Sequence, residues 1–132
     1  MNPQELPGQL QDFLAQHISS VAQLELLLLL HSTAPRPWTA ADLARELRID
    51  TLGAQAQADD LCLRGLLACG RQTPVHYWYQ PVDQHRAAGV QLLADLYADR
   101  RVSIISFIYS RPVDQIKLFA DAFRLRKDKP NG

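Results

Sequence analysis

The sequence predicts one small, mainly helical domain that also carries a short β-hairpin, an α+β fold. Apolar residues recur every three or four positions through most of the chain, which is the spacing of amphipathic helices. One run, Val75–Gln80, alternates apolar and polar residues instead, which is typical of a strand. The chain has 132 residues, of which 47% are hydrophobic, so it is long and apolar enough for one compact core.

Two helices are expected in the first quarter of the chain. Gln9–His17 carries Leu10, Phe13 and Leu14 at helical spacing, so it predicts a short amphipathic helix. Ser19 or Ser20 is a suitable N-cap for a second helix that runs to about His31. This second segment is apolar on nearly every side, which indicates a helix buried at the centre of the fold.

The next segment predicts two helices joined by a tight turn. Prolines in Ser32–Pro37 end the previous helix. Thr39 caps a new helix, Asp50 caps the next one, which runs to about Arg64, and Gly65 ends it. The expected inner stripes of the two helices consist of Leu43, Ala44, Leu47, Ala54, Ala58 and Leu61. This arrangement is a helix-turn-helix.

A hairpin and further helices follow. Leu66–Arg71 and Val75–Gln80 predict the two strands, and we expect the aromatic face of the second strand to pack against the helix after it. That helix spans Gln84–Tyr109 and is expected to bend near Asp99–Arg101, where polar residues gather. A last helix is expected from Ser110 onward, followed by a basic end.

The residues "WTAADLARELRID", Ala58, Leu61 and "GLLACG" resemble the bacterial winged-helix transcriptional regulators. The resemblance covers roughly Val21–Pro81. It implies a winged helix-turn-helix with additional N- and C-terminal helices, a short strand at Trp38, and dimerisation through the long helix after the wing. The expected division is an N-terminal arm and helix (1–18), the winged helix (19–82) and the C-terminal helices (83–129).

The resemblance also implies a regulator that binds double-stranded DNA as a homodimer. Such binding needs cations for the phosphates and polar side chains for the base edges. The charge does not favour it, because the whole chain has 14 basic and 14 acidic residues and the segment 36–72 has five of each. For each arginine the alternative is a solvated surface position or an ion pair. The candidate DNA-binding residues are Arg36, Arg45, Arg48, Thr51, Gln55 and Arg71.

The apolar residues of the last two helices predict a dimer interface. They are numerous for a domain of this size, and the alternative is packing within the chain onto Val21–His31. The candidates are Leu93, Leu96, Ile104, Phe107, Ile108, Phe119 and Phe123.

Two other functions stay open. A winged helix can bind protein instead of DNA, here through the Asp50–Arg64 helix with Leu52, Gln55, Asp59 and Leu63 as a neutral contact face. The chain could also be a ligand or redox sensor, because Cys62 and Cys69 lie seven residues apart.

Several classes of site and location are not expected. The four histidines are scattered, so we expect neither a metal nor a cofactor. No nucleophile motif or phosphate-binding loop indicates an enzyme. The sequence shows no signal peptide or membrane-length apolar run, and two cysteines suit a reducing compartment. We therefore expect a cytoplasmic protein.

Overall fold

The computed structural model describes residues 6–110 and places five helices and three strands in them. In chain order the elements are α1 (Gly8–His17), α2 (Val21–Ser32), β1 (Trp38–Thr39), α3 (Ala40–Leu47), α4 (Thr51–Leu63), β2 (Leu67–Gly70), β3 (His76–Tyr79) and α5 (Gln84–Ser110). This confirms the mainly helical fold with a small hairpin. The helix expected after Ser110, with Phe119, Phe123 and the basic end, lies outside the described residues.

Helices α2, α3 and α4 begin where the sequence predicts, because each has a side-chain cap. Replacing such a cap with alanine costs about 1 kcal/mol. The capping bonds run from Gln23 N to Ser20 Oγ (3.1 Å), from Asp42 N to Thr39 Oγ1 (3.1 Å) and from Gly53 N to Asp50 Oδ2 (2.8 Å). Gly65 then turns the chain after α4 with a left-handed φ of 79°, a conformation that suits glycine.

The three strands form one antiparallel sheet in the order β1–β3–β2. Trp38 pairs with Tyr77, so the short strand expected at Trp38 is present. The buried Tyr77 hydroxyl donates to Asp59 of α4, and the Tyr79 ring meets His31 of α2 edge-on at 5.0 Å. The aromatic face of β3 therefore packs on α4 and α2. The expectation that it packs against the long helix is wrong, because α2 and α4 already cover that face.

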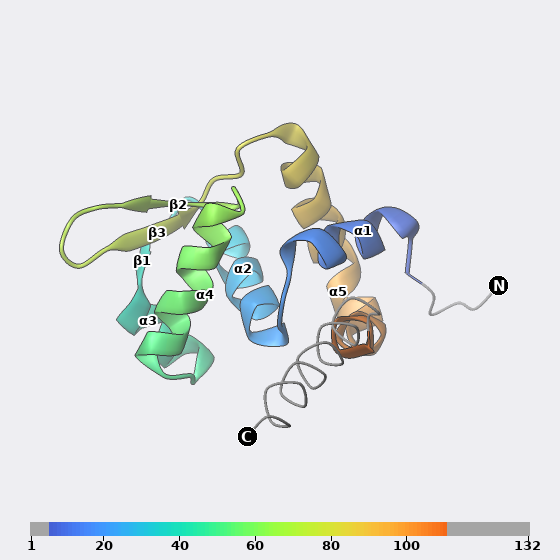
Figure 1. Cartoon of the computed structure of the whole chain (residues 1–132), viewed down its shortest axis with the longest axis horizontal. Coiled ribbons are helices and arrows are strands. Elements are labelled where there is room, and N and C mark those ends of the chain that lie inside the picture. Colours follow the sequence, from blue (N-terminus) through green and yellow to red (C-terminus); the bar gives the residue numbers. More distant parts are fainter. Residues whose placement is uncertain (1–5, 111–132) are drawn as a thin grey trace, which may run out of the picture.

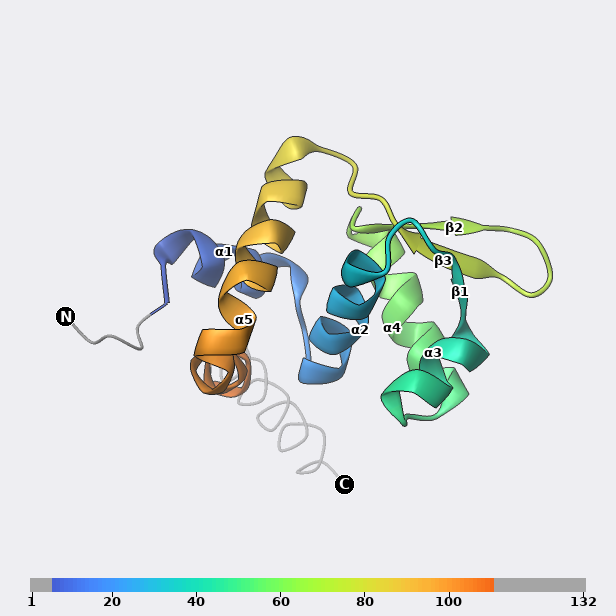
Figure 2. The same ribbon diagram turned by 180° about the vertical axis from the view of Figure 1, so that it is seen from behind.

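The elements divide into two ends with α2 between them (Figures 1 and 2). The wing formed by β2 and β3 lies with α3 and α4 at one end, and α1 lies with α5 at the other. Helix α5 is kinked at Arg100, whose backbone is non-helical (φ −120°, ψ 27°), as the sequence predicts.

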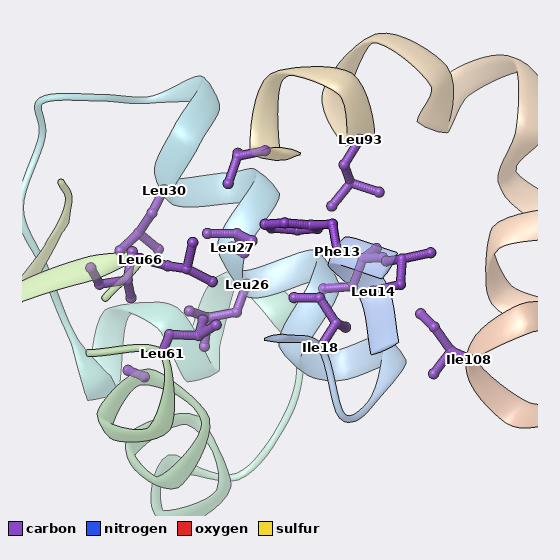
Figure 3. Packing of buried hydrophobic residues seen from close by; sticks show 14 of the residues in the cluster. Phe13, Leu14, Ile18, Leu26, Leu27, Leu30, Leu61, Leu66, Leu93 and Ile108 are labelled. Atoms are coloured by element: carbon purple, nitrogen blue, oxygen red, sulfur yellow. The ribbon is translucent and has the colours of Figure 1, made fainter. Parts of the chain in front are cut away.

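The core is continuous through both ends, and α2 forms its centre. Leu24, Leu26, Leu27 and Leu30 of α2 are all fully buried, which confirms the predicted central helix. Figure 3 shows Leu27 between Leu66, on the side of the wing, and Phe13 of α1. Because both ends share these contacts, core mutations at either end are expected to destabilise the whole fold.

Among the described residues, no single helix is long and apolar enough to cross a membrane. Taken together, α1 and α2 would suffice by length and composition alone, but a bend of 106° separates them.

His17 at the end of α1 makes stability depend on pH. Burial lowers the pKa of His17 below its ordinary value of 6.5, and the nearby Arg86 and Arg64 add to the effect. As pH falls through 6.5, the unfolded chain binds a proton that the folded chain does not, so stability falls. We expect the wild type to lose more stability between about pH 7 and pH 5 than His17→Asn does, measured by urea unfolding. Equal losses in the two proteins would contradict this assignment.

Candidate nucleic-acid interface

The helix-turn-helix is built as the sequence predicts. Helix α3 ends at Leu47, and Arg48 adopts the left-handed conformation with a φ of 59°. Ile49 N then donates to Ala44 O at 3.0 Å, which closes the turn before Asp50 caps α4. This turn sets α4 across α3 and leaves one side of α4 exposed.

Four arginines are exposed on or beside these elements. Arg45 lies on α3, Arg48 in the turn and Arg71 at the start of the β2–β3 connection. Arg45 forms only an exposed 3.6 Å ion pair with Asp42, which stabilises little. The fourth, Arg36, stacks its guanidinium 3.8 Å from the centre of the Trp38 ring. The wing, α3 and α4 share one end of the molecule, so these cations lie at the same end (Figure 1).

Apart from Asp59, the exposed residues of α4 are uncharged. Thr51 and Gln55 are exposed, so a donor and an acceptor are available along this helix. Leu52 is 78% exposed and Leu63 is 87% exposed. This face could therefore meet either base edges or an apolar partner surface.

The two carboxylates of α4 accept hydrogen bonds from other elements, although Asp59 remains exposed and Asp60 is only partly buried. Asp59 accepts a 2.6 Å hydrogen bond from the Tyr77 hydroxyl, and burial together with this bond raises the Tyr77 pKa. Asp60 accepts 2.7 Å bonds from Gln23 Nε2 and from Arg64 Nε. Burial opposes these bonds, but they hold the Asp60 pKa below its ordinary value.

The sequence analysis missed this hydrogen-bond network. It counted Asp59, Asp60 and Arg64 only as charges of the segment 36–72. All three have partners on other elements, and Asp59 is exposed as expected. Arg64 also donates to Gln16 O at 2.8 Å, so it is a structural residue. The sequence signal was the polar Gln23 among the leucines of a helix predicted to be central, and Gln23 is fully buried.

The predicted dimer residues fall into three groups. Leu93, Ile104 and Ile108 are buried inside the single chain, so they belong to the core and offer no accessible surface. Leu96 and Phe107 are only partly buried on α5. Phe119 and Phe123 lie outside the described residues.

The cysteines lie close together where α4 meets the wing. Cys62 is half-buried and Cys69 is exposed. Burial, Cys69 and Asp59 raise the pKa of Cys62 to about 12. Within residues 6–110, no three His, Cys, Asp or Glu side chains come close enough to hold a metal ion.

An open hollow separates the end of β3 from α5. It has a volume of about 650 Å³ and is lined by Tyr79, Gln84, Ala88 and Leu92, among others. Because this hollow is wide open, its shape does not select a particular ligand.

Comparisons with solved structures identify the fold. No protein-family model matches the chain, and no curated protein matches its sequence. The reduced form of MarR from E. coli matches 92% of this chain and 86% of its own, with a TM-score of 0.53 and 17% identity. The multiple antibiotic-resistance repressor (MarR) from Listeria monocytogenes matches 91% and 82%, with a TM-score of 0.50 and 18% identity.

A third solved structure is similar to this chain over a comparable length. The adhesin competence repressor (AdcR) from Streptococcus pyogenes matches 88% of this chain and 85% of its own, with a TM-score of 0.50 and 12% identity. The chain therefore has the winged helix-turn-helix fold of the MarR-type regulators, as the resemblance in its sequence implied.

Proposed function

We propose that this protein is a DNA-binding transcriptional regulator of the winged-helix type. The observation that carries the proposal is the distribution of charge at the helix-turn-helix end. Arg45, Arg48 and Arg71 are exposed there, whereas both α4 carboxylates, Asp59 and Asp60, are bonded to other elements. The three guanidinium groups are therefore accessible to phosphates, and Asp60 is ion-paired with Arg64, although Asp59 remains an exposed carboxylate.

We also propose that it acts as a homodimer through α5 and the residues that follow. Leu96 and Phe107 are the accessible members of the predicted interface. Val102 and Tyr109 lie seven residues apart on one side of α5 and are each 73% exposed. Large apolar side chains exposed together favour an interface. Two protomers would double the phosphate contacts of one. Sedimentation at tens of micromolar should give a dimer, and a clean monomer would contradict this proposal.

The DNA proposal predicts salt-dependent binding to duplexes of random sequence. Fluorescence anisotropy should show an affinity that falls linearly with salt on a log–log scale. Arg48→Asn and Arg71→Gln should each reduce the slope by about 1 per bound protomer. Asparagine is chosen at residue 48 because it tolerates the left-handed backbone there.

Arg101→Gln is the matched control. Arg101 is an exposed arginine on α5, at the opposite end of the molecule from the wing. The control should bind DNA with the wild-type slope. Absence of DNA binding even at low salt would contradict the proposal. An equal reduction of the slope in all three variants would show that the DNA contacts lie elsewhere.

A second function is favoured by one observation, the exposure of Leu52 and Leu63 on α4. Exposed leucines are expected at a protein-binding surface and are not needed for contacts to phosphates. A protein-binding winged helix would show no salt-dependent DNA binding. Its complex with a partner would be weakened by Leu52→Ser and Leu63→Ser but retained by Arg48→Asn and Arg71→Gln.

A further inference from the structure

The chain fold brings Cys62 and Cys69 together although they lie on different elements. Cys62 is in the last turn of α4, and Cys69 is in β2, the first strand of the wing. The turn at Gly65 reverses the chain between them and is closed by a bond from Leu66 N to Leu61 O (3.0 Å). As a result β2 runs back beside α4.

The sheet register orients Cys69 toward α4. Cys69 stands opposite Tyr77 on the neighbouring strand, so the two side chains share one face of the sheet. The Tyr77 hydroxyl reaches Asp59 of α4 at 2.6 Å. Asp59 and Cys62 are three residues apart and therefore lie on the same side of the helix. This geometry places the two cysteines close together, and Cys69 is near enough to Cys62 to contribute to its raised pKa.

The two thiols differ in their access to solvent. Cys69 is exposed, so a dissolved oxidant reaches it first. Cys62 is half-buried, and its pKa of about 12 keeps it a thiol at neutral pH. A dissolved oxidant therefore reaches Cys69 first, and Cys62 is the neighbouring thiol.

We propose that Cys62 and Cys69 form a reversible intramolecular disulfide when a hydroperoxide reaches Cys69. The Cys69 sulfur attacks one peroxide oxygen and the O–O bond breaks. The leaving oxygen takes the proton that the Cys69 thiol gives up and departs as an alcohol (as water when the oxidant is hydrogen peroxide), and a sulfenic acid remains on Cys69. The Cys62 sulfur then attacks the Cys69 sulfur and the S–O bond breaks. The leaving hydroxide takes the Cys62 proton as water. Two thiols and one hydroperoxide thus give one disulfide, one alcohol and one water.

The bond would tie the end of α4 directly to the wing. At present this junction depends on packing and on the hydrogen bond between Tyr77 and Asp59. The disulfide step needs no DNA, so it can fail or succeed independently of the proposed DNA-binding function.

The test is to titrate the reduced full-length protein with hydrogen peroxide. After quenching and denaturation, free thiols, intact mass and non-reducing gels are measured. Both thiols should disappear together, the mass should fall by two hydrogens, the chain should stay monomeric on the gel, and dithiothreitol should restore both thiols. Loss of one thiol with a gain of oxygen, or a disulfide between two chains, would overturn the proposal.

Two variants separate the roles of the cysteines. In Cys69→Ser, the Cys62 thiol should resist peroxide that oxidises the wild type, because the entry point is gone. In Cys62→Ser, Cys69 should stop at a sulfenic acid that dimedone traps. Cys69 is exposed, so its variant should keep the wild-type circular dichroism spectrum even if Cys62→Ser does not fold. Rapid oxidation of Cys62 in folded Cys69→Ser would contradict the proposed order.

Discussion

Replacing Gly89 with alanine is expected to lower the free energy of unfolding by about 2 kcal/mol. Gly89 is buried in α5 where it crosses α1, and a Cβ there would overlap the ring of Phe13. The ring is only 5% exposed and lies 5.2 Å from the ring of His17, so it has little room to move aside. The helices must separate to admit the methyl group. This cost exceeds the gain of about 1 kcal/mol that alanine brings to a helix interior.

Gly8→Ala is the matched control, because a Cβ at Gly8 in α1 would meet nothing within 4 Å. It should leave stability unchanged or raise it slightly. Phe13→Leu combined with Gly89→Ala should cost less than the sum of the two single changes, because the smaller side chain makes room. Urea unfolding of all four variants measures these differences. If Gly89→Ala is as stable as Gly8→Ala, the close contact between α1 and α5 is not present.

The local elements could be predicted because their signals lie within a few residues. Thr39 and Asp50 each accept a bond from a backbone N–H three residues on, so their role is visible in sequence. The polar run near Arg100 likewise indicates the kink in α5. The face against which β3 packs was predicted wrongly, because alternation shows that a strand has a buried face and does not show which helix covers it.

The candidate site was predictable only in part, because local sequence patterns do not show which distant residues contact each other. Arg45, Arg48 and Arg71 could be selected as exposed cations from their places in the helix-turn-helix pattern. The partners of Asp59 and Asp60 lie 18 residues later in the chain on β3 and 37 residues earlier on α2, respectively. No local pattern relates residues so far apart. The hydrogen bonds that the α4 carboxylates accept from other elements could therefore be found only in the structure.

Gln23→Glu is expected to lower the free energy of unfolding by about 3 kcal/mol, which is more than the effect expected for Gly89→Ala. The Gln23 side chain is fully buried, and its Oε1 accepts bonds from Ser19 N (2.9 Å) and Ser19 Oγ (3.1 Å). Its Nε2 donates to Asp60 Oδ2 at 2.7 Å, which joins α2 to α4. Glutamate keeps the shape and the acceptor but removes this donor. It also places a second carboxylate against Asp60, where burial makes an unpaired charge costly.

The free energy of unfolding of Gln23→Glu should approach that of the wild type as the pH falls. The matched control, Gln91→Glu, should stay close to the wild type throughout. The introduced glutamate should have a raised pKa in the folded state, so between about pH 4.3 and that value the folded chain binds the extra proton. The gap in stability from the wild type should therefore narrow from pH 7 toward pH 5. In Gln91→Glu the same change is made beside Asp95, to which the Gln91 amide donates at 2.8 Å, but on the exposed surface of α5. It should cost less than about 0.5 kcal/mol. If both variants lose equal stability at every pH, the buried bond between α2 and α4 does not hold the helix-turn-helix in place.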